Sequence, residues 1–189
     1  MMRVLLLVLA FLGPLEQVDM ALQRAVQDAR RPGLENPARF LSDKVGKSGA
    51  VFGMLLAICL IDGASGVATA RLAVLTLIPV NLTVEGLKRL TYRARPDGEH
   101  KRSNASFPSS HAANAFAIAA VLARRWRRAA PYLWTLAGLI GASRIYLNRH
   151  YTSDAVVGAV VGLVGAWYVH REWERWRARS RARATLPEG

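Results

Sequence analysis

The chain has 189 residues, of which 52% are hydrophobic, and its formal net charge is +13. This length is enough for one domain with a full core and short for two domains. Ten of the 26 basic residues lie in two arginine-rich segments that border apolar runs, residues 124–128 (RRWRR) and 171–183. Such positions are typical of the cytoplasmic ends of membrane helices, so we expect no nucleic-acid partner. The single cysteine, Cys59, excludes an intrachain disulfide.

The first 47 residues divide into two segments. Residues 1–15 combine the basic start MMR with the apolar run VLLLVLAFLG, a pattern that signal peptides share with short first membrane helices. No clear small-residue cleavage site follows, and both interpretations stay open. Residues 16–47 are mixed in charge and contain RRPG and ENP, which predicts an amphipathic connecting segment with turns.

Five apolar stretches then predict a helical core over residues 48–171. They are too long and too rich in Ala and Leu for strands, and they lack period-two alternation. Several are shorter than the ~20 residues of a spanning helix, but terminal Lys and Arg side chains can extend to the membrane surface. The sequence therefore predicts an all-α, multi-pass transmembrane bundle of five or six helices. The apolar stretches are residues 48–61, 67–87, 106–123, 129–143 and 155–169.

The positions of the arginines predict the orientation of this bundle. Basic segments of membrane proteins face the cytoplasm. With residues 124–128 and the basic tail 172–189 on that side, the loops 88–108 and 144–153 both lie on the opposite face. We therefore expect a protein of the cell (inner) membrane with a site on its periplasmic or extracellular face.

Two clusters of polar residues lie in the first of these loops and directly after it. In KRLTYRARP, Lys88 and Arg95 are seven residues apart, so on one helix they would point in nearly the same direction. In FPSSH, Ser109 or Ser110 is suited to cap the next helix, which would leave free backbone N–H groups beside His111.

The third cluster is SRIYLNRHYTSD, residues 143–154, which separates two uncharged runs. It contains Arg144, and it places His150 and Asp154 four residues apart, close enough to meet across the start of a helix. Each cluster alone has a structural explanation, as interfacial anchors, as a turn with a cap, or as a hydrogen bond at a helix end. Together they describe a different feature, a site for a tetrahedral dianion.

Phosphoryl transfer needs such a combination of groups. Three cations and the donors around Ser109 would stabilise the charge on the equatorial oxygens as the bond breaks. A histidine oriented by a carboxylate is a competent nucleophile, and a second histidine can protonate the leaving oxygen. The alternative is a metal site formed by His111, His150 and Asp154, which the three nearby cations disfavour.

The three motifs resemble the signature of the type-2 phosphatidic acid phosphatase superfamily. That signature reads Lys-x6-Arg-Pro, then Pro-Ser-Gly-His, then Ser-Arg-x5-His-x3-Asp. All three spacings match over about a third of the chain. Ser110 stands where the signature has glycine, which bears on how closely a backbone N–H approaches the phosphate. The matching residues are Lys88 with Arg95-Pro96, Pro108-Ser109-Ser110-His111, and Ser143-Arg144 with His150 and Asp154.

The resemblance also implies a role for each of these residues. His150 would form a phosphohistidine intermediate, Asp154 would activate it, and His111 would protonate the leaving group. No metal or other cofactor would be needed. Vanadium-dependent haloperoxidases share the signature, but they are larger soluble proteins. The phosphate would be held by Lys88, Arg95, Ser109, Ser110 and Arg144.

We therefore expect a membrane-embedded phosphatase, of the phosphoric monoester hydrolase or pyrophosphatase type, that acts on a lipid phosphate or on a prenyl pyrophosphate such as undecaprenyl pyrophosphate. A lipid fits because its tail can stay in the bilayer while its headgroup enters the site. Residues 16–47 and an apolar groove would select the lipid. Two alternatives are a secreted, soluble acid phosphatase with the same site and a non-catalytic membrane protein that binds lipid headgroups.

The sequence leaves the identity of the lipid and the oligomeric state open. Gly158 and Gly162 form a small-xxx-small face, which is suited to pack a helix closely within the chain or between chains.

Overall fold

The computed structural model describes residues 16–46, 48–100 and 104–184, and within these ranges all regular structure is helical. The expected all-α class is confirmed for this part of the chain. Residues 1–15, for which a signal peptide or a first helix is expected, lie outside it. In chain order the elements are a helix over residues 16–28, α2 (Pro32–Arg39), the π-helix η1 (Phe40–Val45), α3 (Ser48–Thr91), α4 (Ser110–Arg125), the 3-10 helix η3 (Arg127–Ala129), α5 (Ala130–Tyr146) and α6 (Thr152–Ala184).

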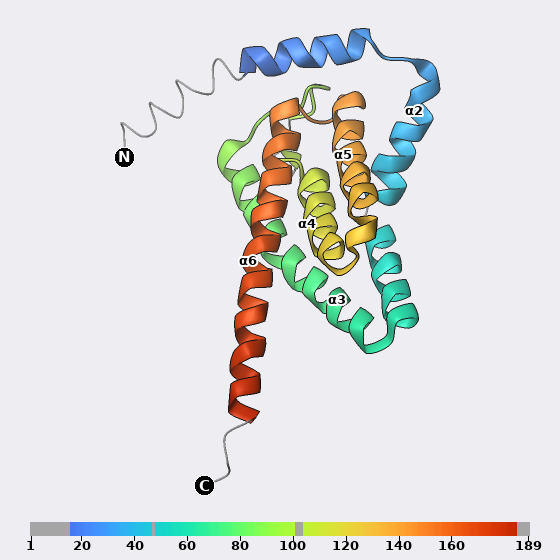
Figure 1. Ribbon diagram of the computed structural model, residues 1–189. Helices are drawn as coiled ribbons and strands as arrows, with labels where there is room; N and C mark the ends of the chain where they lie inside the picture. The colour runs from blue at the N-terminus through green and yellow to red at the C-terminus, as the bar shows by residue number, and fades with distance from the viewer. Residues whose placement is uncertain (1–15, 47, 101–103, 185–189) are drawn as a thin grey trace, which may run out of the picture.

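Helix α3 consists of two arms that meet at Gly63. This residue has φ 54° and ψ −133°, a backbone conformation that glycine adopts without a steric penalty. The chain descends along the first arm, reverses at the bend and rises along the second arm (Figure 1). These arms correspond to the expected stretches 48–61 and 67–87. An ion pair of 2.6 Å between Arg125 and Asp62 ties the bend to the end of α4.

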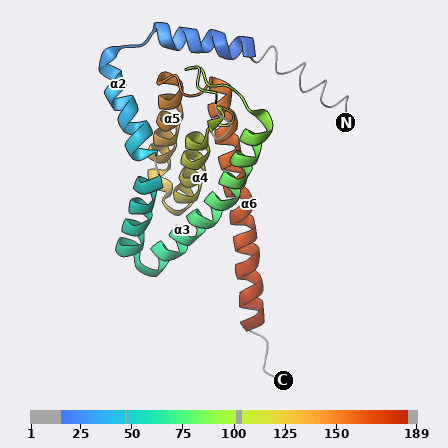
Figure 2. The same cartoon turned by 180° about the vertical axis from the view of Figure 1, so that it is seen from behind.

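Helix α4 packs against α3, α5 and α6 (Figures 1 and 2). Its buried side chains are mostly small, among them Ala112, Ala113 and Ala117. Large apolar side chains lie on the outside of the molecule instead, and Leu60 and Ile61 are 77% and 86% exposed. Small residues between helices and large apolar residues outside are the arrangement of helices that pack within lipid.

Two glycines of α6 allow the backbone of that helix to pack directly against the backbone of α4. A Cβ placed on Gly158 would lie 2.4 Å from the carbonyl oxygen of Ser109, and one on Gly162 would lie 2.2 Å from that of Ala113. Neither oxygen can move away without distorting α4. The small-xxx-small face therefore packs a helix within the chain.

We expect Gly162→Ala to lower the free energy of unfolding by about 1–3 kcal/mol, because its methyl group would overlap the α4 backbone. The matched control is Gly138→Ala on the exposed side of α5, where an added Cβ meets nothing within 4 Å. Thermal unfolding of the detergent-solubilised proteins, followed by circular dichroism, measures the difference. Equal melting temperatures for the two variants would contradict the close packing.

Among the described residues, two segments are long and apolar enough to cross a membrane, Gly53–Thr91 and Thr152–Arg183. The bend at Gly63 interrupts the segment Gly53–Thr91, so its uninterrupted helical part is the second arm of α3. Helices α4 and α5 have 16 and 17 residues. At 1.5 Å per residue they are about 25 Å long, somewhat less than the ~30 Å hydrocarbon core. The multi-pass bundle of five or six helices stays a prediction.

The two ends of the bundle differ in chemistry. One end carries the loop from α3 to α4, the loop from α5 to α6, and the helix over residues 16–28, which lies across it (Figure 1). The other end carries the arginine-rich turn between α4 and α5, and α6 extends beyond the bundle on that side. The expected separation of the polar clusters from the basic segments therefore matches the fold.

Candidate active site

The three polar clusters converge at the end of the bundle that the helix over residues 16–28 covers. Lys88 lies in the last turn of α3 and Arg144 in the last turn of α5. His111 and Asp154 lie in the first turns of α4 and α6, and His150 lies in the loop before α6. Because every group sits at an element terminus, the site forms only when all four helices pack.

Arg95 also lies at this end of the bundle, but on a different element from the one expected. Helix α3 ends at Thr91 and Tyr92 has φ 45°, so Arg95 lies on the following loop. The expectation of one helical face shared with Lys88 is therefore wrong. Asn104 fixes the guanidinium instead, because its backbone oxygen accepts from Nε at 2.8 Å and its side-chain oxygen accepts from a terminal nitrogen.

The three cations of the site are buried. Lys88, Arg95 and Arg144 are 9%, 5% and 7% exposed, and Lys88 lies within electrostatic range of both arginines. Arg144 donates one hydrogen bond to the hydroxyl of Ser42, whereas its buried Nε has no hydrogen-bond partner among the described residues. Gathered positive charge with an unused donor is suited to hold an oxyanion.

Ser109 and Ser110 form the start of α4. The Oγ of Ser109 accepts a long hydrogen bond of 3.4 Å from the backbone N–H of Ala112, and its own N–H donates to the carbonyl oxygen of Asp154 at 2.9 Å. Ser110 is the first helical residue and is half-buried. The serine at the signature's glycine position thus fits a helix start, where backbone N–H groups are available to an anion.

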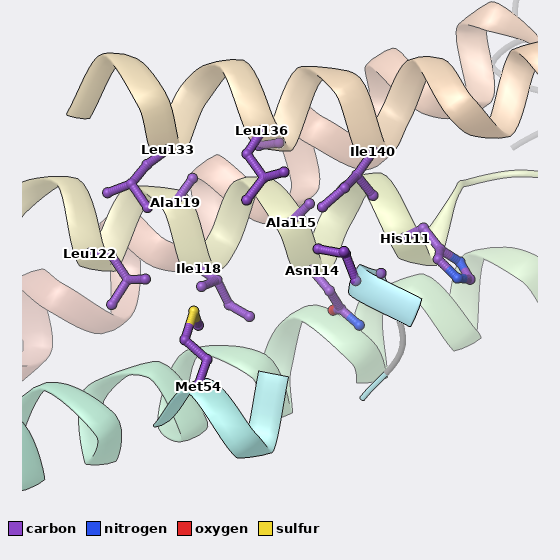
Figure 3. Close-up of a pocket in the computed structure, with 13 residues that line it drawn as sticks. Met54, His111, Asn114, Ala115, Ile118, Ala119, Leu122, Leu133, Leu136 and Ile140 are labelled. Carbon is purple, nitrogen blue, oxygen red and sulfur yellow. The ribbon is translucent and has the colours of Figure 1, made fainter. Parts of the chain in front are cut away.

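Two cavities share His111 as a lining residue. One is polar, with a volume of about 450 Å³. The other has a volume of about 190 Å³ and an almost wholly apolar wall, with His111 at one end (Figure 3). The polar cavity is lined by Arg39, Ser42, Asp43, Asp97, His111, Arg144, Leu147 and Arg149. The wall of the apolar cavity includes Met54, Ala115, Ile118, Leu122, Leu136 and Ile140.

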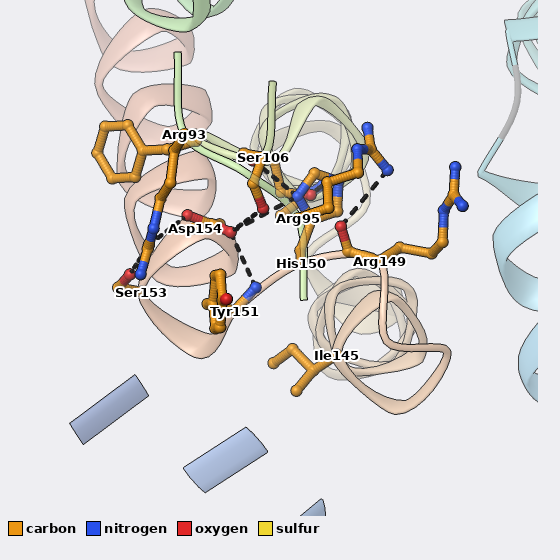
Figure 4. Close-up of polar contacts among 12 residues, drawn as sticks. Arg93, Arg95, Ser106, Ile145, Arg149, His150, Tyr151, Ser153 and Asp154 are labelled. Carbon is orange, nitrogen blue, oxygen red and sulfur yellow. Dashed lines mark hydrogen bonds and ion pairs between the residues drawn. The ribbon is translucent and has the colours of Figure 1, made fainter. Parts of the chain in front are cut away.

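His150 is 1% exposed and its ring is held by one hydrogen bond. Its Nδ1 donates to the backbone oxygen of Ser106 at 2.7 Å (Figure 4). Because a carbonyl oxygen only accepts, this contact places the proton on Nδ1 and leaves the lone pair on Nε2. Nε2 is therefore the nitrogen that can attack an electrophile.

Asp154 contacts His150 less directly than the motif spacing indicates. Its Oδ2 lies 3.8 Å from Nδ1, which is too long for a hydrogen bond. The carboxylate accepts instead from Arg93 at 2.7 Å, from the N–H of Tyr151 at 2.8 Å and from the hydroxyl of Ser106. Ser106 joins the two groups, since its hydroxyl contacts Asp154 while its carbonyl contacts His150.

The environment of His150 keeps its imidazole neutral. Its pKa is lowered to about 4, mainly by burial and also by the charges of Arg144 and Arg95, whereas Asp154 acts in the opposite direction. At pH 7 the ring is therefore unprotonated, which is the form that carries a nucleophilic lone pair.

This lowered pKa predicts a loss of stability in acid. The unfolded chain binds a proton at His150 near pH 6.5, whereas the folded protein binds it only near pH 4. We therefore expect the melting temperature of the wild type to fall more steeply than that of His150→Gln as the pH is lowered from 6.5 to 4.5. Parallel curves for the two proteins in detergent would show that His150 titrates normally.

Several residues around the site have no counterpart in the sequence motifs. Arg39, Ser42 and Asp43 come from the segment 16–47, which was expected only to select the lipid. Arg93 and Arg149 occupy variable positions inside the motifs, and only their charge beside the motif residues could have marked them. Arg149 forms ion pairs with two acidic residues of the α3–α4 loop, Asp97 at 2.7 Å and Glu99 at 3.1 Å.

Across the described residues, no group of three His, Cys, Asp or Glu side chains lies close enough to hold a metal ion, and this includes the set of His111, His150 and Asp154.

An all-α bundle that gathers several buried cations, the buried His150 and the half-buried His111 at one end is suited to bind an oxyanion. Residues 50–178 match the family model of the PAP2 superfamily. That match covers more than half of the chain, so the protein belongs to the PAP2 superfamily, and the resemblance of its motifs is confirmed.

Curated relatives match the chain over shorter regions. It is 40% identical over 76 residues to a lipid A 1-phosphatase of Porphyromonas gingivalis, which is 38% of this chain and 16% of that protein. It is 34% identical over 85 residues to a lipid A 4'-phosphatase of Bacteroides thetaiotaomicron, 43% and 37% of the two chains. A decaprenylphosphoryl-5-phosphoribose phosphatase of Mycobacterium tuberculosis is 37% identical over 102 residues, 50% and 56%. The chain thus spans little more than half of these relatives at most.

Two solved structures share the fold over most of their length. Aquifex aeolicus LpxE aligns with a TM-score of 0.71 at 26% identity, covering 80% of this chain and 94% of LpxE. A transmembrane PAP2-type phosphatidylglycerolphosphate phosphatase of Bacillus subtilis aligns with a TM-score of 0.70 at 24% identity, covering 86% and 87%. At that identity the second match shows the fold alone.

Proposed function

We propose that this protein is a membrane-embedded phosphatase that hydrolyses a lipid phosphate monoester or a prenyl pyrophosphate through a phosphohistidine intermediate, without a metal. Membership of the PAP2 superfamily supports the lipid phosphatase activity. The site faces the periplasm or the cell exterior, residues 48–171 form the catalytic core, and the basic tail 172–189 lies in the cytoplasm.

In the first step, Nε2 of His150 attacks the phosphorus atom of the bound headgroup. The bond between phosphorus and the leaving oxygen breaks, and His111 gives that oxygen a proton, which His111 takes up when the phosphate dianion binds beside it. Lys88, Arg95 and Arg144 hold the equatorial oxygens, whose charge rises in the transition state. Their positive charge also favours the neutral form of His150 before the attack.

In the second step, water attacks the phosphorus of the phosphohistidine and releases inorganic phosphate. His111, now neutral, takes a proton from that water, and the bond to Nε2 breaks. Asp154 and the carbonyl of Ser106 keep the proton of His150 on Nδ1 through both steps. The imidazole therefore returns to the form in which it began.

The observation that best supports a lipid substrate is the shared position of His111. The leaving oxygen must lie at His111, because that residue protonates it. His111 borders the polar cavity, which Arg144 lines and His150 does not, and the apolar cavity, whose wall suits a hydrocarbon chain. A lipid phosphate bound with its phosphorus at His150 would extend its tail from His111 along α4.

The exposed apolar surface favours this function over the secreted soluble phosphatase. Val156, Val160 and Val164 of α6 are 56%, 51% and 57% exposed, which forms an apolar stripe on the outside of the bundle. Carbonate extraction of membranes from expressing cells tests the difference. The protein should stay in the pellet, whereas a soluble phosphatase would wash into the supernatant.

A substrate panel on the purified, detergent-solubilised protein tests the activity itself. Phosphate release is measured from phosphatidate, phosphatidylglycerophosphate, lipid A and undecaprenyl pyrophosphate, with glycerol phosphate as the water-soluble comparison. We expect release from at least one lipid and a much lower rate with glycerol phosphate. EDTA should leave the rate of phosphate release unchanged. A loss of that release on addition of EDTA would support the metal mechanism.

A further inference from the structure

The helix over residues 16–28 is attached to the bundle by its polar side. Asp19 and Gln23, one turn apart, are 2% and 6% exposed, whereas Val18 and Leu22 are 55% and 44% exposed. A helix on the surface of a water-soluble protein buries its apolar side instead. The buried polar residues therefore need partners in the bundle, and those partners lie beside the candidate active site.

Asp19 has three such contacts. One carboxylate oxygen accepts from the N–H of Ser153 at 2.9 Å, and the other accepts from the hydroxyl of Ser153 and from Arg93 at 2.8 Å. A carboxylate that is 2% exposed is stable only with such charged and hydrogen-bonded partners.

Arg93 connects this carboxylate to Asp154. One terminal nitrogen contacts Asp19. The other contacts Asp154 at 2.7 Å and the hydroxyl of Ser153 at 2.9 Å (Figure 4). The guanidinium carbon lies 4.2 Å from the centre of the Tyr151 ring, which covers one face of the group. Burial alone would lower the pKa of Arg93, but the two carboxylates outweigh it and raise that pKa.

We propose that Asp19 and Arg93 are positioning residues for the catalytic histidine. Arg93 holds the carboxylate of Asp154, Asp154 holds the hydroxyl of Ser106, and the carbonyl of Ser106 holds Nδ1–H of His150. Asp19 keeps Arg93 in the one orientation that serves Asp154. The inference rests on the proposed function, because it assigns His150 as the nucleophile.

The experiment compares four variants with the wild type in the lipid phosphate assay, Asp19→Asn, Arg93→Gln, Arg93→Lys and Tyr146→Phe. Tyr146→Phe is the matched control. Its hydroxyl donates to the backbone oxygen of Arg31 at 2.7 Å and accepts from the Arg31 N–H at 2.9 Å, so it ties the same N-terminal segment to α5 without touching Arg93.

We expect Asp19→Asn and Arg93→Gln to lower kcat by about 10- to 100-fold, the size of effect that a misplaced reacting group produces. KM should stay within about two-fold, because the phosphate-binding cations are unchanged. Arg93→Lys should recover part of the loss, and Tyr146→Phe should keep wild-type kcat. The double variant of Asp19→Asn and Arg93→Gln should be no slower than Arg93→Gln, since both act through one contact chain.

Three results would overturn the positioning role. These are an unchanged kcat in Asp19→Asn, a loss in Tyr146→Phe as large as in Asp19→Asn, and multiplicative losses in the double variant. A wild type that releases phosphate from no lipid would contradict the proposed function instead. The contact chain is then tested by the ¹⁵N chemical shifts of labelled His150, which should show the single Nδ1–H tautomer in the wild type and a mixture in Asp19→Asn; identical spectra would reject it.

Discussion

Replacing His150 by alanine should abolish phosphate release, with a fall in kcat of about four orders of magnitude or more. In the proposed mechanism the imidazole supplies the attacking atom, and no other described side chain in the site can take its place at that position. Binding of the lipid should persist, because Lys88, Arg95 and Arg144 remain. The measurement is single-turnover phosphate release from the best lipid of the panel.

The control for this variant is His170→Ala. His170 lies far along α6, near the opposite end of the bundle, and its Nε2 contacts Glu174 at 3.4 Å. That variant should turn over like the wild type. A ³²P-labelled lipid adds a direct test, since the wild type should acquire an alkali-stable, acid-labile label that His150→Ala lacks. Label or turnover in His150→Ala would assign the nucleophile to another residue.

Filling the apolar cavity should separate long lipids from short ones. Ala115 lies one helical turn after His111 and lines that cavity. In Ala115→Phe, the added ring would occupy the space next to the leaving oxygen where the tail is proposed to lie. We expect kcat/KM for a long-chain lipid phosphate to fall by about 10- to 100-fold, equivalent to losing a few buried methylene groups.

The same variant should hydrolyse a short-chain lipid phosphate at nearly the wild-type rate. Leu139→Phe is the matched control, because Leu139 is 49% exposed on α5 and does not line the cavity. Equal losses for long and short chains would indicate damage to the phosphate site. No loss for either chain would place the tail elsewhere on the protein.

The sequence predicted the convergence of the three motifs better than it predicted the contacts among their residues. The motif residues could be found because they are charged or polar residues at fixed spacings next to apolar runs. Their convergence followed from the topology, since loops two apolar segments apart lie on one face. The prediction that Lys88 and Arg95 share one helix was wrong, because spacing alone does not show that Tyr92 leaves the helical conformation.

The contacts that fix the site come from residues with no local signal. Asp19 meets Arg93 and Ser153 across 74 and 134 residues of sequence. Ser42 reaches Arg144 across 102 residues. From sequence alone, a single Asp or Ser in a mixed-charge segment is interpreted as a solvated residue. Only the packing of that segment over the bundle gives such a residue a partner. The role of the carbonyl of Ser106 is equally hidden, because every residue has one.

The small side chains between α4 and α6 have a consequence for how the protein is made. Removing alanine and glycine side chains from water yields little hydrophobic free energy, so the contact between α4 and α6 contributes little to folding in an aqueous compartment. The free energy comes instead from transferring the outer Leu, Ile and Val side chains into lipid. Insertion should therefore precede close packing, and the site should assemble only after the segments are already in the bilayer. A chain released into the cytoplasm would remain unpacked, which would confine the proposed phosphatase activity to the membrane.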